Sequence, residues 1–433
     1  MDVAVTAMLG VSDRFGRILV MPGLLHAPAS LIRPQVNTRA TSLRPDGLAW
    51  EEQAADTPRF PGPATRLLIE GQRTNQVRNP RCEGAIPGLP GTMPTNWVPQ
   101  APSGGLQRQV VGTGAEGGIQ YVDLRLFGTT TGANAQWRVD LLPVNQASAA
   151  QGQTWTSSVF ARLVAGSIPG GVSAALFVQE FNSSGGQLQQ TSVSFAAATT
   201  GPLASQRFSH TRTLTDAATA FVAAPFFFNV PTAGTVVDFT IRIGFPQLEQ
   251  GSFASTPILP PSGTPGASTR GTDILTAPLS SLGIAGNGAC TVLWRGVFSA
   301  TNIGDTQTII GIDSGDDTSR YDLRLGTTGI PQLVRLVGST PTSSAFGSTA
   351  VTPGATIRAG MAIDGAGRVA AVYDGFAGGA VQAITAGATS GLTTFRHGSS
   401  TFGNRPVWGE THTLTVLPRV LSDADLQAAV AAL

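Results

Sequence analysis

The sequence contains no lysine: all 27 basic residues are arginine, against 26 acidic residues and a net charge of +1. Charged residues make up only 12 % of the chain, about half the usual ~25 %. The arginines form no basic run that could follow a phosphate backbone, so nucleic acid is not expected as a ligand. With 41 % hydrophobic residues the chain also differs from disordered proteins, which combine high charge with few apolar residues.

Cysteine and long apolar runs are nearly absent as well. Cys82 and Cys290 fall in different predicted domains, which argues against a disulfide scaffold and a Cys-pair metal site and favours two buried small hydrophobes. No stretch approaches the ~20 apolar residues of a membrane span. Asp2 stands where a secretory signal peptide carries basic residues. We therefore expect synthesis in the cytoplasm without a signal peptide, and no membrane insertion.

Glycine and proline, by contrast, are abundant, at 53 and 29 residues, as expected for many short strands joined by turns. The stretch "TWTSSVFARLV" alternates so that Trp155, Val159 and Leu163 share one face of a strand. The stretch "VSAALFVQEFNSSGGQLQQTSVSF" reads as two strands around a turn at Gly185-Gly186. These patterns predict an all-β protein.

The order of these patterns predicts four regions. Residues 1–78 show poor periodicity, apart from a short helical piece over 48–55, and should dock onto something else because they lack a core of their own. Residues 79–257 are predicted to form a two-sheet sandwich or jelly roll, and residues 273–433 a second sandwich. Residues 258–272, rich in Pro, Gly, Ser and Thr, are predicted to be a stiff joint between the two.

Two local signals stand out in the C-terminal region. Asp364–Gly367 predicts a tight reversal between two strands, and Asp374-Gly375 predicts the next. At the end of the chain, Ser422 is placed as the N-cap of a short helix, with Asp425 three residues later. The expected fold is therefore two antiparallel β-sandwiches behind an irregular N-terminal segment, with one short C-terminal helix.

Several motifs resemble bacteriophage tail-fibre and head-spike proteins, including those of phage-like gene transfer agents. They are "RATSLRPDGLAWEEQAADTPRF", "RLLIEGQRTNQVRNP", the "NPRCEGA…PTNW" opening of a carbohydrate-binding jelly roll, and the junction "PQLEQGSFASTPILP…TRGTDIL". The ending "LPRVLSDADLQ" is similar to that of a concanavalin- or laminin-G-like sandwich. Cys82 departs from the pattern, because an aromatic residue usually stands there. Together the motifs cover nearly the whole chain.

The resemblance implies a structural adhesion protein on the surface of a virion or phage-like particle. It would bind a host capsular or envelope polysaccharide and attach through residues 1–78 to capsid, spike-base or tail proteins. Its apolar side chains in that segment, from Leu24 to Ile69, would be covered by other subunits or by the particle. The resemblance implies a homotrimer, with a pentamer at a capsid vertex as the alternative.

Sugar recognition needs aromatic rings that stack on sugar CH groups, with amide and guanidinium donors around them. Trp294, within an apolar run, is instead expected in the core. The predicted carbohydrate-binding residues are Tyr121, Trp137, Arg138, Trp155, Gln179, Tyr321, Tyr373 and Trp408.

No cofactor, metal site or catalytic residue is predicted, and the protein is not expected to be an enzyme. The acidic cluster at 313–317 could bind calcium, although a solvated turn is the favoured interpretation. No "GxSxG" nucleophile motif occurs. A polysaccharide depolymerase, with paired carboxylates, and a purely structural decoration or baseplate component are the alternatives.

Overall fold

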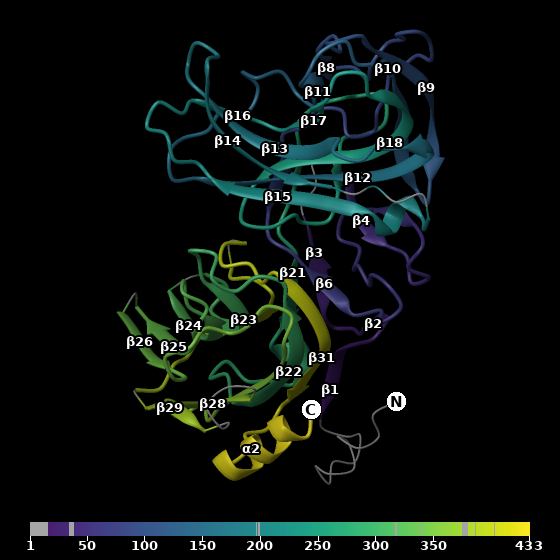
Figure 1. Cartoon of the computed structure of the whole chain (residues 1–433). Helices are drawn as coiled ribbons and strands as arrows, with labels where there is room; N and C mark the ends of the chain where they lie inside the picture. Colours follow the sequence, from purple (N-terminus) through teal and green to yellow (C-terminus); the bar gives the residue numbers. More distant parts are fainter. Residues whose placement is uncertain are drawn as a thin grey trace. The chain divides into compact units, whose positions relative to one another are not determined.

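The computed structural model describes residues 16–33, 39–195, 197, 200–316, 318–338, 340–374, 380–385, 387–401 and 403–433. The chain forms two compact units (Figure 1). Unit 1 takes the described residues of 1–34, 55–72 and 271–433, and unit 2 takes those of 35–54 and 73–270. Each unit contains two large antiparallel sheets, and one short α-helix follows near the C-terminus, which confirms the predicted fold class.

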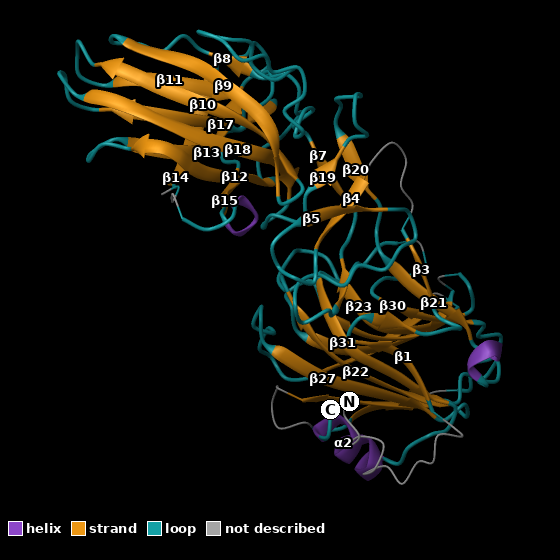
Figure 2. Ribbon diagram, turned by 90° about the vertical axis from the view of Figure 1, so that its right-hand side faces the viewer, coloured by secondary structure: helices purple, strands orange, loops and turns teal. Residues whose placement is uncertain are grey.

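Unit 2 is a sandwich of a five-stranded and a six-stranded sheet, whose long strands run side by side in Figure 2. The five-stranded sheet has the order β15 (Arg207–Thr213), β12 (Thr154–Ser167), β18 (Val236–Gln250), β10 (Ile119–Thr129) and β9 (Leu106–Glu116). The six-stranded sheet has the order β14 (Gln187–Ser194), β13 (Ser173–Phe181), β17 (Pro225–Val230), β11 (Ala135–Asp140) and β8 (Val98–Pro99), with β16 (Phe221–Ala223) on β13.

The core of unit 2 follows the alternation of its strands. Residues at every second position, such as Val122 and Leu124 of β10, face the other sheet and are buried. A smaller cluster around Phe160 and Phe245 lies on the opposite side of the five-stranded sheet, where Trp50 packs against it. The remaining elements are β19 (Ile258–Leu259), β4 (Arg39–Leu43) and β5 (Trp50–Gln53) in one small sheet, β20 (Ser268–Arg270) with β7 (Arg73–Asn75), and the 3-10 helix η1 (Leu203–Ser205).

Unit 1 is a second sandwich, of an eight-stranded and a seven-stranded sheet. The eight-stranded sheet has the order β2 (Leu24–Leu25), β1 (Arg17–Met21), β31 (Gly409–Leu417), β22 (Cys290–Phe298), β27 (Thr356–Ile363), β28 (Arg368–Asp374) and β29 (Gln382–Thr385), with β6 (Leu67–Ile69) on β31. The seven-stranded sheet has the order β26 (Thr340–Ala345), β25 (Pro331–Val337), β24 (Ser319–Leu325), β23 (Gln307–Asp313), β30 (Thr394–His397), β21 (Ile274–Pro278) and β3 (Ser30–Ile32). The 3-10 helix η2 (Ser280–Leu282) follows β21.

The C-terminal helix α2 (Asp423–Ala431) begins as predicted. The Ser422 side chain accepts a hydrogen bond from the backbone N–H of Asp425, 3.2 Å away, and caps the first turn. Leu426 and Val430 pack with Leu293 and Val372 on the side of the eight-stranded sheet that faces away from the other sheet. Two predicted turns are also confirmed: Asn182 and Gly186 close the β13–β14 hairpin, and Asp364 and Arg368 close the β27–β28 hairpin. Gly375 lies outside the described residues.

The N-terminal segment is not the coreless anchor that its sequence predicts. β1 pairs with β31, β3 with β21 and β6 with β31, so short strands from this segment complete both sheets of unit 1. Their side chains at Leu19, Leu31 and Ile69 lie in the unit 1 core. The predicted helix over 48–55 is also wrong, because Trp50–Gln53 form strand β5 beside β4. In the described part of this segment most apolar side chains are therefore covered by their own chain, although Ile18, Leu24, Ile32 and Leu48 remain exposed.

A buried ionic cluster in unit 1 joins the N-terminal segment to the C-terminal half. The Asp273 carboxylate accepts from Arg33 at 2.9 Å and from Arg59 at 2.6 Å, and Arg59 also donates to Glu70 at 2.7 Å. The side chains of Arg33, Arg59 and Asp273 are fully inaccessible to solvent. Ions buried in this way are tolerated only where charges and hydrogen bonds compensate one another. This cluster therefore holds three chain segments together.

The predicted joint at 258–272 is also corrected by the structure. Ile258 and Leu259 pair with β4, and Ser268–Arg270 pair with β7. The side chains of Ile258 and Arg270 are fully buried in unit 2. Proline and glycine in this stretch shape a folded segment rather than a linker, and the division between the units falls after Arg270.

Candidate functional site

Five of the predicted sugar-binding aromatics lie in the cores of the two sandwiches. Their exposed fractions are 1 % for Trp137, 3 % for Trp155, 0 % for Tyr321, 1 % for Tyr373 and 4 % for Trp408. Trp137, for example, stacks on Phe228 with ring centroids 5.8 Å apart. A ring surrounded by protein has no face to offer a sugar, so these five assignments are wrong. Trp294 is buried as predicted, at 0 %.

Tyr121 lies on the outer side of the five-stranded sheet, but a guanidinium group covers one face of its ring. The Arg242 guanidinium sits 3.5 Å from the ring centroid, and Gly114 on the neighbouring strand leaves room for the phenol. Arg242 is itself held by Asp123 at 2.9 Å and by Glu116 at 2.6 Å, and these hydrogen bonds raise its pKa above the ordinary value. The charges on this face therefore neutralise one another.

Arg138 and Gln179, the other two predicted residues, come together on one surface. Since Trp137 of β11 and Val178 of β13 point into the core, their neighbours Arg138 and Gln179 point outward from the six-stranded sheet. The strand register extends this surface across four strands, with Arg138 opposite Phe227 and Phe227 opposite Ala175. We call this surface the aromatic face; it consists of Arg138, Phe177, Gln179, Phe227 and Asn229 with the small residues between them.

Two phenylalanines that sequence reasoning missed lie at the centre of the aromatic face. Phe177 and Phe227 are only partly buried, and their rings meet edge to face with centroids 5.7 Å apart. Ala175 is opposite Phe227 and two positions before Phe177 on β13, and Ser194 and Ser192 are opposite Ala175 and Phe177 on β14. Small neighbours leave the rings standing above the sheet. The signal in the sequence is "PFFFNV", in which the middle Phe must face opposite to its two neighbours.

The polar groups of the aromatic face are incompletely paired. Gln179 donates from Nε2 to Gln190 at 2.5 Å, while its Oε1 accepts no hydrogen bond from any described residue. Asn229 Oδ1 is likewise shielded from solvent without a donor among the described residues. Arg138 forms a bidentate pair with Asp140, with Nη2 donating to Oδ1 at 2.6 Å and Nε donating to Oδ2 at 3.1 Å. Shielded amide oxygens without donors are costly, and a ligand hydroxyl would satisfy them.

The corresponding surface of unit 1 is different. On the outer side of the seven-stranded sheet, Asp313 accepts from Arg396 at 2.6 Å, and Asp322 accepts from Arg320 at 2.6 Å. Burial raises the pKa of both carboxyl groups, whose side chains are 4 % and 3 % exposed. Each carboxylate is therefore closed off with an arginine partner rather than presented to solvent.

Metal ligands are not gathered in the described part of the chain. No group of three or more His, Cys, Asp and Glu residues there could hold a metal ion. At 313–316, Asp316 accepts from the hydroxyls of Ser314 and Thr318, each at 2.6 Å, and shapes a turn between β23 and β24. Asp317 lies outside the described residues. No helix among the described residues is long and apolar enough to cross a membrane.

Comparison with known proteins gives structural similarities only. No protein family and no curated protein match the sequence. Similar solved structures include the CBM40 of the Ruminococcus gnavus IT-sialidase (15 % identity, 33 % of this chain and 82 % of that chain, TM-score 0.27) and domain 4 of the Geobacillus stearothermophilus arabinanase AbnA with arabinotriose (14 %, 37 % and 73 %, TM-score 0.28). The CBM22 tandem of Paenibacillus barcinonensis Xyn10C covers 78 % of this chain and 99 % of its own, at 11 % identity and a TM-score of 0.23. TM-scores this low do not establish a common fold.

Proposed function

We propose that the aromatic face of unit 2 binds a polysaccharide and that the protein is an adhesion protein of a phage or phage-like particle. The observation that carries the binding proposal is the pair of partly exposed rings, Phe177 and Phe227, between shielded amide oxygens of Gln179 and Asn229 that accept no hydrogen bond from described residues. A sugar offers CH groups to the rings and hydroxyl donors to the oxygens, so one ligand class satisfies both.

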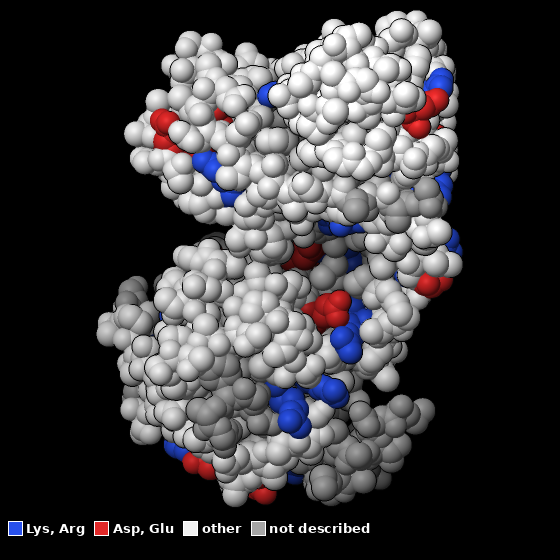
Figure 3. Space-filling model, viewed as in Figure 1, with Lys and Arg blue, Asp and Glu red and all other residues white. Residues whose placement is uncertain are grey.

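The geometry suits a polymer better than a single sugar. Strands in a sheet lie ~4.8 Å apart, so the four strands β14, β13, β17 and β11 span about 15 Å, room for several linked residues. Charged side chains are sparse on the molecular surface seen in Figure 3, in keeping with the 12 % charged residues. A shallow face of this kind binds each chain weakly, and several copies on one particle would supply avidity.

The particle assignment rests on the resemblance of residues 39–80 and 245–275 to tail-fibre and head-spike proteins. We propose a host capsular or envelope polysaccharide as the partner, and binding without cleavage. The paired, inaccessible state of Asp313 and Asp322 supports the absence of cleavage at that sheet. The copy number stays a prediction: the structure removes the argument from uncovered N-terminal apolar residues, and light scattering would distinguish a trimer from a pentamer.

The test uses a bacterial surface-glycan array with the full chain and its Phe177→Ala/Phe227→Ala variant. Each ring should contribute about 1 kcal/mol, so the double variant should bind its best glycan roughly 30-fold more weakly. Phe127→Ala is the matched control, because Phe127 is partly exposed on the outer side of the other sheet, under Arg125. It should bind like the parent.

The alternatives give different results in the same experiment. A fall in polymer viscosity on incubation would select a depolymerase. Failure of the parent chain to bind any glycan would select a structural decoration component. Equal binding by the parent and the double Phe variant would show that the aromatic face is not the site.

A further inference from the structure

A pocket of about 440 Å³ lies at one edge of the unit 2 sandwich, where the two sheets end. β8 is the outermost described strand of the six-stranded sheet and contributes Pro99, followed by Ala101 and Pro102. β9 is the outermost described strand of the five-stranded sheet and contributes Arg108. The loop before β8 adds Leu89 and Pro90. We call this cavity the edge pocket.

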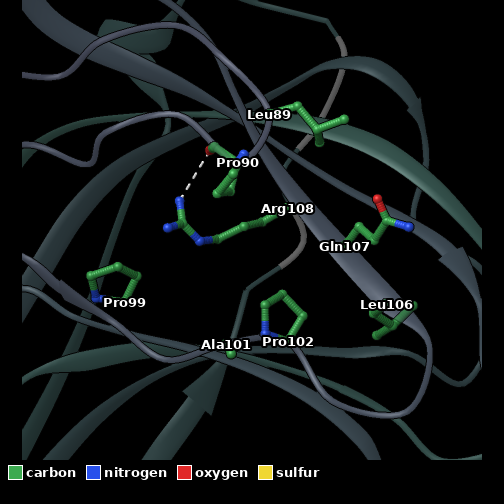
Figure 4. Close-up of a pocket in the computed structure, with 8 residues that line it drawn as sticks. All are labelled: Leu89, Pro90, Pro99, Ala101, Pro102, Leu106, Gln107 and Arg108. Atoms are coloured by element: carbon green, nitrogen blue, oxygen red, sulfur yellow. Dashed lines mark hydrogen bonds between the residues drawn. The ribbon is translucent and has the colours of Figure 1, made fainter.

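The walls of the edge pocket are rigid and mostly apolar. Figure 4 shows Arg108 extended across the middle, with Pro90 on one side and Pro99, Ala101 and Pro102 on the other. Proline carries no N–H and has a fixed φ, so the three prolines contribute shape to the walls but no backbone donor. Leu89 is 64 % exposed at the rim. The guanidinium group of Arg108 is therefore the only positive charge in the lining.

Arg108 lacks a counter-charge in the part of the chain that the structure describes. Its Nη1 donates to the Pro90 carbonyl at 3.1 Å, and no carboxylate among the described residues pairs with it. Partial burial lowers the pKa of Arg108 below its ordinary value, because the charged form loses solvation. Arg125, on the neighbouring strand, instead has Asp238 at 2.6 Å. An anion in the edge pocket would give Arg108 the negatively charged partner that Asp238 provides for Arg125.

The edge pocket and the aromatic face lie on the two sides of strand β8. Asp140 on that face is opposite Val98 of β8, and Val98 directly precedes Pro99 of the pocket. Pro99 itself pairs with Val139, whose side chain lies in the core, and Val98 is 43 % exposed at the edge of the sheet. A polymer that lies across the strands of the aromatic face would therefore reach the pocket by passing over the edge strand β8.

We propose that the edge pocket binds a carboxylate-bearing sugar residue of the polymer, with Arg108 as its anion anchor. The saccharide nature of the ligand rests on the proposed function; its negative charge is inferred from Arg108. A single guanidinium matches one carboxylate, which it can bind through two parallel hydrogen bonds. The prolines pack against the ring, and the aromatic face holds the neighbouring residues.

The test compares polygalacturonate with its fully methyl-esterified form, which has the same backbone without the charge. The full chain should bind the acidic polymer about tenfold more tightly. Arg108→Gln should abolish this preference and leave binding of the neutral polymer unchanged, which also shows that the variant is folded. Arg125→Gln, on the outer side of the other sheet, is the control and should keep the preference. The Phe177→Ala/Phe227→Ala variant should lose affinity for both polymers.

A second readout separates this inference from the proposed function. The Nε–H signal of Arg108 in the NMR spectrum should shift with glucuronate and stay in place with glucose. A shift with glucuronate when neither polymer binds would overturn the polysaccharide face and keep an acidic-sugar pocket. No preference in the parent chain, or a preference that survives Arg108→Gln, would overturn the edge pocket while polymer binding could still stand. An equal response to inorganic phosphate would overturn the carboxylate assignment.

Discussion

The two sandwiches present opposite kinds of outer sheet face. In unit 1 the seven-stranded sheet carries Asp313 with Arg396 and Asp322 with Arg320, all nearly inaccessible. In unit 2 the aromatic face carries two partly exposed rings and amide oxygens without donors among the described residues. The difference teaches that a sandwich does not make a binding site by its architecture. In our proposal, the face that binds is the one whose own polar groups lack hydrogen-bond donors among the described residues.

The same contrast applies to stability. Unit 1 depends on polar groups in its interior that connect distant segments, so changes there should unfold it. Substitutions on the aromatic face of unit 2 should instead weaken binding and have little effect on folding. Each unit has one buried thiol, Cys290 in unit 1 and Cys82 in unit 2. Burial raises the pKa of Cys290 to about 12 and that of Cys82 well above its ordinary value, so thiol labelling reports the opening of each unit separately.

The largest effect is expected from removing the N-terminal segment. A fragment of residues 273–433 lacks β1, β3 and β6, and with them the buried side chains of Leu19, Leu31 and Ile69. Each such loss costs about 2–5 kcal/mol, and a domain has only about 5–15 kcal/mol in total. The fragment should be insoluble or label at Cys290 at the rate of unfolded protein. A soluble fragment with a protected thiol would show that the N-terminal strands are dispensable for unit 1.

The next effect is expected at the ionic cluster. Asp273→Ala removes the shared partner of Arg33 and Arg59, whose side chains are fully inaccessible. Leaving buried charges uncompensated costs about 3–5 kcal/mol. Labelling of Cys290 should accelerate strongly in this variant, while that of Cys82 should not change. Equal acceleration of both thiols would mean that the two units unfold as one.

The strands, hairpins and helix cap could be predicted because their signals are local. Alternation around Val159, the Asp364 reversal and the Ser422 cap depend on neighbours within a few residues. The N-terminal strands β1, β3 and β6 could not be predicted, because strands of three to five residues have no measurable period and their partners β31 and β21 lie hundreds of positions away.

The candidate site was only partly predictable, because a strand with aromatics on both sides does not show which side is the core. Trp137 and Arg138 are neighbours on β11, yet the tryptophan is buried and the arginine faces outward. The aromatic residues predicted from the sequence were Trp and Tyr, large rings that favour the core, and Phe177 and Phe227 were not among them. The side of β11 that faces outward follows from its pairing with β17 and from the pairing of β17 with β13. These pairings join distant parts of the chain and are not a local property.

An acid-sensitive step is expected in unit 1 from His397. This ring is fully buried between the two sheets: its Nδ1 donates to the Ile309 carbonyl, and its Nε2 accepts from the Thr411 hydroxyl, which accepts from Trp294. Burial lowers the pKa of His397 to about 4, so the folded ring stays neutral while the unfolded ring takes up a proton below about 6.5. Unit 1 should therefore lose about 3 kcal/mol as the pH falls from 6.5 to 4.

Urea unfolding at pH 7 and pH 4.5, with peptides of each unit followed by pulsed hydrogen exchange, measures this loss. Burial, together with Arg66 and Arg295, also lowers the pKa of His412 to about 4. The protonation of this ring on unfolding should therefore add to the loss of unit 1 stability as the pH falls. His397→Gln should be less stable at pH 7 and show a shallower dependence on pH. A dependence unchanged by this substitution would assign the acid sensitivity to other groups.

The smallest effect is expected at Phe227, and its neighbour Phe228 provides the comparison within one strand. Phe228 is fully buried against Trp137 and Phe239, so Phe228→Ala should destabilise unit 2 by about 3–5 kcal/mol. Phe227 is partly exposed on the aromatic face, so its truncation leaves no closed cavity and solvent fills the vacated space. Phe227→Ala should therefore cost no more than about 1 kcal/mol of unfolding free energy. Cys82 labelling and urea unfolding measure both variants. If Phe227→Ala instead destabilises unit 2 as much as Phe228→Ala, this ring is a structural part of the sandwich, and a loss of glycan binding in that variant would no longer locate the site.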